Sequence, residues 1–367
     1  MKPLLRVEDL RVWFPVRKGF IETLLGRMEY VRAVDGVTFS INERETFCLV
    51  GESGCGKTTT ARALMMLVDR SELRSGRILI RPHEETLREI SKIQPEAVVD
   101  GEYVDMARVR GYAGRLMRRE VQMIFQDPFG SINPRMRIYD VVEEPLVIHG
   151  IGSREERAER VARALEAVKL TPPEEFASRY PHELSGGQRQ RVSIARALVL
   201  NPRLLLADEP VSMLDVSIRA EVLQILEELK KTRGMSIVFI THDIALARYI
   251  CDRIAVMYLG KIVEVARADE IIENPLHPYT RALISAVPDV VPENRLKLRA
   301  VPIKGEVPSA IRIPQGCRFR PRCVAYDENP WVRGFCEKEE PGLVEVSPGH
   351  SVACWIPIKR GQVQEPS

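Results

Sequence analysis

The chain has 367 residues, of which 45% are hydrophobic and 29% are charged, and its formal net charge is +3. A chain of this size can bury one large core and a second, smaller one, so we expect two domains. The small net charge, without a long basic run interleaved with aromatic residues, argues against a nucleic-acid-binding protein. We find no apolar stretch of signal-peptide length at the N-terminus and no window of roughly eighteen apolar residues, which predicts a soluble, cytoplasmic protein.

Residues 4–45 alternate apolar and polar side chains in short runs, which predicts antiparallel strands. One run contains Phe14, whose ring offers a flat apolar surface for a nucleotide base, and Tyr30 is a rival for that role. A buried aromatic residue of a sheet is an equally good interpretation of Phe14.

The strongest motif is the sequence GESGCGKT at residues 51–58, which has the spacing of a phosphate-binding loop. An apolar run over 45–50 predicts a buried strand before it, and residues 58–66 predict a helix after it. Small residues let the backbone N–H groups and the helix N-terminus point at phosphate oxygens. We expect Lys57 to reach the β and γ phosphates and Thr58 to hold Mg²⁺. The expected nucleotide-binding residues of this loop are Gly51, Ser53, Gly54, Cys55, Gly56, Lys57, Thr58 and Thr59.

A further strand is predicted over 75–80, and residues 82–118 are charged and without clear period, which indicates a surface insertion with some helix. The strand predicted over 121–125 ends at Gln126. This amide can bind Mg²⁺ or the attacking water opposite a γ phosphate, and a loop-capping amide is the alternative. Residues 131–182 predict a helical insert, in which Ser153 caps one helix.

A second glycine-rich helix start lies at residues 183–191, ELSGGQRQR, before an apolar helix over 192–200. A serine and two glycines at a helix start form an anion-binding N-terminus. The chain therefore carries two phosphate-binding helix starts that are far apart in sequence.

Polar residues follow two further apolar strands. The strand over 204–208 ends in adjacent carboxylates, where Asp208 can organise a Mg²⁺ shell and Glu209 can activate or position a water. Helix caps are the alternative, which the phosphate loop in the same chain makes less attractive. The strand over 236–240 is followed by His242, at the strand end where ligands bind in open α/β sheets, so we assign it a functional role.

Over about residues 1–265 this set of motifs resembles the nucleotide-binding subunits of ABC transporters. The corresponding motifs are the Walker A loop at 51–58, the Q-loop glutamine Gln126, the signature motif at 184–188, the Walker B strand at 204–208 with the catalytic Glu209, the D-loop at 212–215 and the switch histidine His242. Met213 departs from the family pattern, since the D-loop often carries alanine at this position.

The resemblance implies an α/β fold: a P-loop nucleotide-binding domain over 1–266, with a mixed core sheet, an antiparallel β subdomain and a helical subdomain at about 131–182. Residues 267–367 form a C-terminal extension (the extension below). The resemblance further implies these roles: catalysis by Glu209, His242 and Gln126, Mg²⁺ ligation by Thr58, Gln126 and Asp208, stacking of adenine on Phe14, and contacts of Ser185, Gly187 and Gln188 with ATP held by a second ABC subunit, either a copy of this chain or a paralogue.

Four further stretches, at 123–128, 131–134, 180–183 and 274–283, resemble oligopeptide and dipeptide importers. They imply an ATPase that powers import through two transmembrane permease subunits, with an extracytoplasmic solute-binding receptor, from the cytoplasmic face of the membrane. Oligosaccharide or nickel cargo stays open. A soluble ABC ATPase acting on ribosomes or DNA fits less well, because those proteins usually carry two nucleotide-binding domains or a long coiled coil.

Four of the seven cysteines, Cys317, Cys323, Cys336 and Cys354, lie in the extension. Such clustering in a cytosolic chain indicates a metal site, and four thiolates can hold a [4Fe-4S] cluster or Zn²⁺, with unligated thiols as the third option. The resemblance adds that the cysteines of some importers form an iron–sulfur site, so we expect a cluster that staples a small domain. His350 either replaces a cysteine or lies in an exposed loop.

Overall fold

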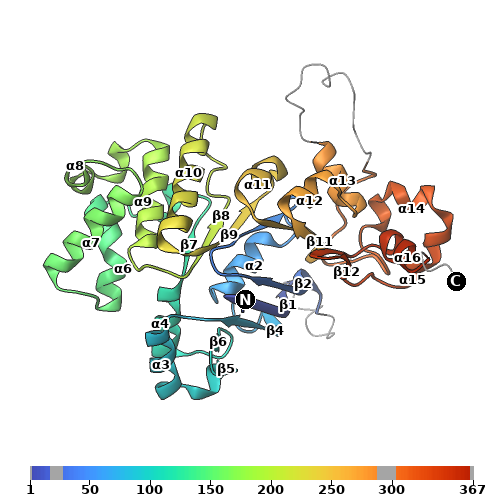
Figure 1. Cartoon of the computed structure of the whole chain (residues 1–367), viewed down its shortest axis with the longest axis horizontal. Helices are drawn as coiled ribbons and strands as arrows, with labels where there is room; N and C mark the ends of the chain where they lie inside the picture. The colour runs from blue at the N-terminus through green and yellow to red at the C-terminus, as the bar shows by residue number, and fades with distance from the viewer. Residues whose placement is uncertain (1, 17–27, 287–302, 364–367) are drawn as a thin grey trace.

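The computed structural model describes residues 2–16, 28–286 and 303–363 (Figure 1). Its core is a mixed sheet with the strand order β12-β13-β11-β10-β3-β9-β8-β7, in which the strands from β10 to β7 pair in parallel and the others antiparallel. The strands are β3 (Thr46–Val50), β7 (Val121–Ile124), β8 (Leu204–Asp208), β9 (Ser236–Thr241), β10 (Arg253–Tyr258), β11 (Lys261–Arg267), β12 (Val344–Ser347) and β13 (His350–Val352). The predicted mixed core sheet is confirmed.

The central strands β3, β8 and β9 are buried at every residue, as is typical of parallel strands covered on both faces. Val50 pairs with Thr241, and Asp208 pairs with Ile240, so the three strands end along one edge of the sheet. Helices that follow them are α2 (Lys57–Leu64), α10 (Val216–Arg233) and α11 (Ile244–Ile250). The sheet therefore brings together the residues that follow its strands.

The second sheet is antiparallel, with the order β2-β1-β4-β6-β5, as residues 4–45 predict. Its strands are β1 (Leu5–Pro15), β2 (Tyr30–Ile41), β4 (Leu73–Ile80), β5 (Val98–Val99) and β6 (Tyr103–Asp105). The segment 82–118 supplies β5 and β6 together with α3 (Glu84–Ile93) and α4 (Gly111–Glu120). Since Ile90, Val104 and Met117 are buried, this segment extends a core rather than only the surface.

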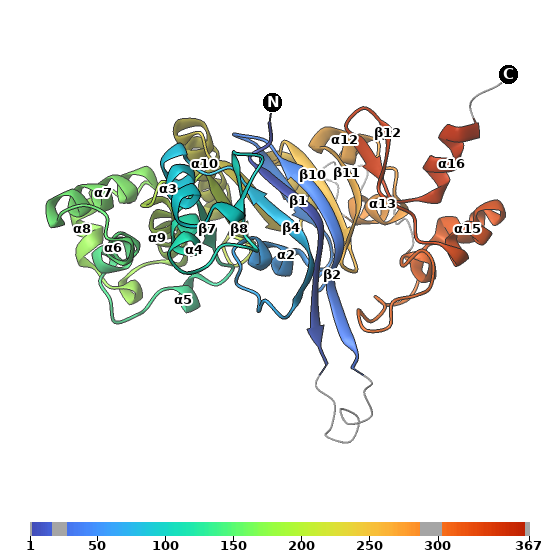
Figure 2. The ribbon, with the colours of Figure 1, turned by 90° about the horizontal axis from the view of Figure 1, so that it is seen from below.

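A helical lobe, α5 to α9, lies at one end of the molecule (Figures 1 and 2). Its helices are α5 (Pro128–Ser131), α6 (Ile138–His149), α7 (Arg154–Ala167), α8 (Pro173–Ser178) and α9 (Gly186–Leu198). Ser153 caps α7 as predicted, because its hydroxyl accepts from Glu156 N. Within the described ranges, no helix is both long and apolar enough to cross a membrane.

The extension lies at the opposite end, yet it shares the core sheet (Figures 1 and 2). Its helices are α12 (Ala268–Glu273), α13 (Pro278–Ser285), α14 (Val324–Glu328), α15 (Arg333–Lys338) and α16 (Trp355–Val363). Strands β12 and β13 add to the sheet beside β11, where Glu264 pairs with Val352. The predicted domain boundary between residues 266 and 267 stays a prediction, since the two parts share hydrogen-bonded strands.

A buried carboxylate joins the extension to β11. Glu264 accepts hydrogen bonds from the backbone N–H groups of Leu276 and His277, and lies 2.7 Å from Nε2 of His350. His350 is 2% exposed, so the expectation of an exposed loop histidine is wrong. Its strand, β13, lies between β11 and β12, and no local pattern of the sequence signals its contact with Glu264.

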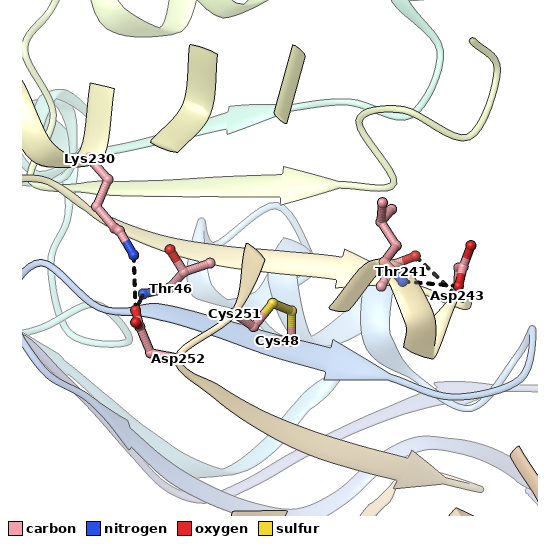
Figure 3. The surroundings of a disulfide bond; sticks show 8 residues. Thr46, Cys48, Lys230, Thr241, Asp243, Cys251 and Asp252 are labelled. Carbon is pink, nitrogen blue, oxygen red and sulfur yellow. Dashed lines mark hydrogen bonds and ion pairs between the residues drawn. A yellow bond between two sulfur atoms is a disulfide. The ribbon is translucent and has the colours of Figure 1, made fainter. Parts of the chain in front are cut away.

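A disulfide joins Cys48 of β3 to Cys251, which follows α11, with the Cα atoms 5.9 Å apart (Figure 3). Beside it, Asp252 accepts hydrogen bonds from Thr46 N at 2.7 Å and from Lys230 Nζ at 3.0 Å. These contacts fix the start of β10 against the strand that leads into the phosphate loop.

Candidate active site

Residues 51–58, the phosphate loop, pack so closely on neighbouring backbone that two positions have no room for a side chain. A Cβ on Gly56, whose φ is +107°, would lie 2.2 Å from the carbonyl oxygen of Ala33. A Cβ on Gly51 would lie 2.3 Å from the carbonyl oxygen of Met257. Glycine at these positions lets the loop fold back between β3 and α2, as the motif predicts.

Lys57 lies at the centre of the loop and is 5% exposed. Its Nζ donates to the carbonyl oxygens of Gly51 at 2.7 Å and of Glu52 at 3.0 Å. Cys55 is buried beneath it, and burial raises the pKa of this thiol. The Cys55 thiol is therefore packed under the loop, so the predicted contact of Cys55 with a nucleotide would come from its backbone N–H.

A pocket of about 400 Å³ opens above the loop. It is lined by residues from β2, the loop, α2 and three strand ends: Ala33, Ser53, Gly54, Gly56, Lys57, Thr58, Thr59, Gln126, Glu209 and His242. The loop and the catalytic residues predicted from the sequence thus share one pocket. Ala33 was not predicted, since its place depends on the packing of β2 against Gly56.

Thr58 and Asp208, the predicted Mg²⁺ ligands, are in direct contact. Thr58 Oγ1 donates to Asp208 Oδ1 at 3.0 Å. Burial raises the pKa of Asp208, the hydrogen bond from Thr58 opposes this effect, and the neighbouring Glu209 carboxylate raises the pKa further. A carboxylate and a hydroxyl at the edge of a phosphate pocket fit a hard cation such as Mg²⁺.

Gln126, Glu209 and His242, the catalytic cluster, come from the ends of three different strands. Gln126 Nε2 donates to Glu209 Oε2 at 3.1 Å, and His242 Nδ1 lies 3.2 Å from Glu209 Oε1. The backbone of Glu209 is left-handed, with φ +45°, and its N–H donates to the carbonyl of Ile240. Such a conformation is uncommon outside glycine and is typical of functional sites. Two side chains thus orient one carboxylate that can position a water.

The signature residues lie elsewhere. Ser185 caps α9: its hydroxyl accepts from Gln188 N at 3.3 Å, and its own N–H donates to Gln188 Oε1 at 3.0 Å. A Cβ on Gly187 would lie 2.5 Å from Cγ2 of Ile218, so α9 and α10 meet closely there. None of the signature residues lines the pocket above the phosphate loop.

Phe14 lies on β1, half-buried, and pairs with Val31 of β2, two residues from Ala33. It is outside the residues that line the phosphate pocket. The ring of its rival Tyr30 is flanked by Trp13, 6.2 Å away between centroids, and by the Arg74 guanidinium at 4.4 Å. Phe14 is therefore the better placed of the two for a base beyond the phosphates, and this role stays a prediction.

The structure adds residues that the sequence analysis missed. Arg219 of α10 donates through Nε to the carbonyl oxygen of Leu214 at 2.7 Å and so holds the loop at 212–215. Tyr279 and Arg322, both in the extension, contact Glu52 of the phosphate loop. Tyr279 lies in a stretch that resembles the importers, but no local signal places it or Arg322 at this loop.

The four cysteines of the extension line one pocket. A hydrogen bond from Cys336 lowers the pKa of Cys317, while burial raises the pKa of Cys323 to about 11 and of Cys354 to about 12. In the described part of the chain, no three His, Cys, Asp or Glu side chains form a group able to hold a metal ion. The predicted iron–sulfur and zinc sites therefore find no support.

The fold and the pocket define an ABC-type ATPase, which binds ATP with Mg²⁺ and hydrolyses it. Residues 34–212 match the family model for the ABC transporter. The dimeric post-hydrolysis structure of the ATP-binding cassette MJ0796 bound to ADP and Pi aligns with a TM-score of 0.56 and 27% identity, over 72% of this chain and 98% of that one. CbiO1 of Clostridium perfringens, 24% identical with a TM-score of 0.57, shares the fold over 75% of this chain and 92% of its own.

Residues 263–328 match the model for the oligopeptide/dipeptide transporter C-terminal region. The oligopeptide transport ATP-binding protein AppF of Bacillus subtilis is 42% identical over 96% of this chain and 97% of its own length. The probable peptide ABC transporter ATP-binding protein y4tS of Sinorhizobium fredii is 43% identical over 96% and 90%. The chain belongs to the ABC transporter family, and within it to the ATP-binding proteins with this C-terminal region.

Proposed function

We propose that this chain is the ATPase subunit of an importer that carries oligopeptides or dipeptides through a membrane permease. The observation that carries the proposal is the match of residues 263–328 to the oligopeptide/dipeptide transporter C-terminal region, which begins in β11 of the sheet that holds the catalytic cluster. Relatives named as peptide transport proteins are similar over nearly the whole chain, which supports the same cargo class.

In this proposal the phosphate loop holds the β and γ phosphates with its N–H groups and with Lys57, which exchanges carbonyl oxygens for phosphate oxygens. Thr58, Gln126 and Asp208 hold Mg²⁺, which supplies positive charge next to the phosphates when bound. Glu209, oriented by Gln126 and His242, positions the attacking water and accepts its proton.

We place the second half of the site on another subunit. Ser185, Gly187 and Gln188 lie outside the pocket of their own chain, and Ser185 is exposed, so we place these residues against the γ phosphate held by a second ABC subunit, a copy of this chain or a paralogue. Two ATP molecules close the dimer, and hydrolysis reopens it, which drives the permease. Adenine stacks on Phe14, at the end of the β1–β2 ladder.

The remaining partners follow from the cargo. Two transmembrane permease subunits and an extracytoplasmic solute-binding receptor complete the importer, and this chain lies peripherally on the cytoplasmic face of the membrane. The receptor and permease select the cargo, so oligosaccharides and nickel are the competing cargoes to test.

The proposal is tested by purifying the membrane complex through a tag on this chain and measuring its ATPase activity with the receptor. We expect short peptides to stimulate hydrolysis. Stimulation by oligosaccharides or nickel alone would keep the mechanism and replace the cargo. Failure to recover any permease would favour a soluble ATPase acting on ribosomes or DNA.

For the four cysteines we keep a [4Fe-4S] cluster as the cofactor to test, because all four thiols line a single pocket. Anaerobically purified protein should then contain iron and absorb near 400 nm, whereas bound zinc without this absorbance would assign Zn²⁺. Protein with neither metal would leave four unligated thiols.

A further inference from the structure

Glu52, the second residue of the phosphate loop, is held at three points. Its carbonyl oxygen accepts from Lys57 Nζ at 3.0 Å, and its N–H donates to the Tyr279 hydroxyl oxygen at 2.9 Å. Its carboxylate accepts two hydrogen bonds from Arg322, at 2.9 and 3.2 Å. Tyr279 and Arg322 both belong to the extension and lie 227 and 270 positions from Glu52 in the sequence. Two distant residues therefore fix the start of the phosphate loop.

The Arg322 contact differs from an ordinary surface ion pair. Arg322 is 7% exposed, and it grips the Glu52 carboxylate with both terminal nitrogens, the bidentate geometry that makes arginine–carboxylate pairs strong. Its guanidinium also lies 5.8 Å from the centroid of the Tyr258 ring. The Arg322 guanidinium is thus shielded from solvent and held in one orientation, while the Glu52 side chain stays partly exposed.

The support behind this contact is rigid. Tyr258, Tyr279 and Phe319 form a buried aromatic cluster, with ring centroids 4.8 to 5.5 Å apart. Two of these rings are 1% and 0% exposed, Tyr258 and Tyr279, so their rotamers are locked by packing. The extension therefore presents a fixed surface to the loop.

We propose that Arg322 is a positioning residue of the ATPase: together with Tyr279 it fixes Glu52, and thereby holds the phosphate loop in the shape that receives phosphate. This inference rests on the assignment of residues 51–58 as the phosphate loop. Lys57 leaves the Glu52 carbonyl when it turns to a phosphate, and the extension then keeps the loop in place. The extension thus tunes nucleotide affinity besides marking the transporter class.

A second arginine provides a matched control. Arg318 is 4% exposed and also ties the extension to the nucleotide-binding part, but it pairs with Asp35 and Glu340 and donates to the Leu259 carbonyl oxygen. None of these partners lies in the phosphate loop. Loss of Arg318 removes attachment of the extension, whereas loss of Arg322 removes attachment and loop positioning together.

The experiment uses the full chain with Arg322→Gln, Glu52→Gln, the double substitution and Arg318→Gln, and measures the Kd for ATP, kcat and Tm of each. We expect Arg322→Gln and Glu52→Gln, the two loop variants, each to bind ATP about tenfold more weakly than wild type. The double variant should bind ATP no more weakly than either single variant, because all three lose the same contact. Arg318→Gln should lower Tm and leave the Kd unchanged. Arg322→Lys should restore part of the affinity.

A wild-type Kd and kcat in both single loop variants, whatever their Tm, would overturn the positioning role. Fold-changes that multiply in the double variant would overturn the pairing with Glu52. If Arg322→Gln fails to fold, Glu52→Gln decides alone, since its side chain is partly exposed. A wild-type chain that binds no ATP would refute the loop assignment itself, whereas a wild-type chain that binds ATP, with unchanged Kd and kcat in the variants, would refute only the positioning role.

Discussion

The helix starts of α2 and α9 are both glycine-rich, yet only that of α2 gathers functional partners. Around it, Thr58 contacts Asp208, and the catalytic cluster lines the same pocket. At the start of α9, Ser185 and Gln188 bond to each other and contribute nothing to that pocket. Since both starts have the chemistry of an anion site, this difference supports the proposal that the chain carries two half-sites, one at α2 and one at α9, rather than one complete site.

The N-terminal capping of α2 also differs from that of α9. Gly56 precedes α2 without any side-chain cap, which leaves the first N–H groups of the helix to a ligand. Ser185 caps α9 and uses one of those groups, the N–H of Gln188. The start of α2 thus leaves N–H groups for a ligand, whereas the start of α9 is capped without one, which fits the proposal that α9 meets a nucleotide held by a partner.

The largest effect should come from Glu209→Gln, which keeps the size of the side chain but removes the base. We expect kcat to fall about 1,000-fold with ATP binding retained, because general base catalysis is worth 10²–10⁴-fold. The measurement is steady-state hydrolysis together with the Kd for ATP. Glu221→Gln, on an exposed helix face, is the matched control and should keep kcat. Hydrolysis at the wild-type rate would remove Glu209 from its role.

Lys57→Ala should act on binding first. Loss of one charged hydrogen bond to phosphate, about 2 kcal/mol, corresponds to a roughly 30-fold weaker Kd for ATP. Titration calorimetry with ATP measures this directly, and Lys92→Ala, at an exposed position of α3, should leave the Kd unchanged. Unchanged affinity in Lys57→Ala would contradict the α2 half-site.

The positions of Lys57 and Glu209 could be predicted because each depends on a local pattern of the sequence. A glycine-rich turn must follow a buried strand, and the residues after parallel strands meet at one sheet edge, which is how Glu209 and His242 come together. The resemblance of the signature motif supplied the second half-site. The antiparallel strands followed from the alternating apolar runs over residues 4–45, and the mixed core sheet followed from the family resemblance.

The rest depends on contacts between distant residues that no local pattern encodes. The Cys48–Cys251 disulfide joins positions 203 apart, and Arg322 and Glu52 are 270 apart. The burial of His350 follows from its pairing with Glu264 across two strands. Such pairings arise only when distant parts of the chain pack together, as the extension does on the core for Arg322 and His350, so the sequence showed the residues but not their partners.

Ser185→Ala tests the α9 half-site at a smaller scale. Loss of the cap should cost about 1 kcal/mol of unfolding free energy, and loss of a hydroxyl at the partner's γ phosphate should lower kcat about tenfold. Ser153→Ala is the matched control, because Ser153 caps α7 in the same capping box away from any predicted phosphate. Denaturation and ATPase assays of both variants separate the two effects. An equal kcat in the two variants would mean that Ser185 only caps α9 and has no role in hydrolysis.

The smallest effect should come from Asp208→Asn, which we expect to raise the free energy of unfolding of the chain slightly. Burial raises the pKa of Asp208, so the folded chain binds its proton more readily than the unfolded chain does. The contribution of Asp208 to the free energy of unfolding is therefore fully present below the pKa that its carboxyl has in the unfolded chain. It is lost as the pH rises through the pKa that the carboxyl has in the folded chain. Asp208→Asn, which mimics the protonated form, should be slightly more stable than wild type at pH 7 without nucleotide, and no more stable at low pH.

Urea unfolding at both pH values measures this, with the exposed Asp269→Asn in α12 as control. Asp208→Asn should also weaken ATP binding in the presence of Mg²⁺, because it removes a carboxylate that is a predicted Mg²⁺ ligand. A variant that is less stable at pH 7 would mean that the Thr58 hydrogen bond outweighs burial. Greater stability with weaker Mg²⁺-dependent binding would show that the α2 half-site keeps a destabilising charge for its ligand, a cost that the capped α9 half-site does not carry.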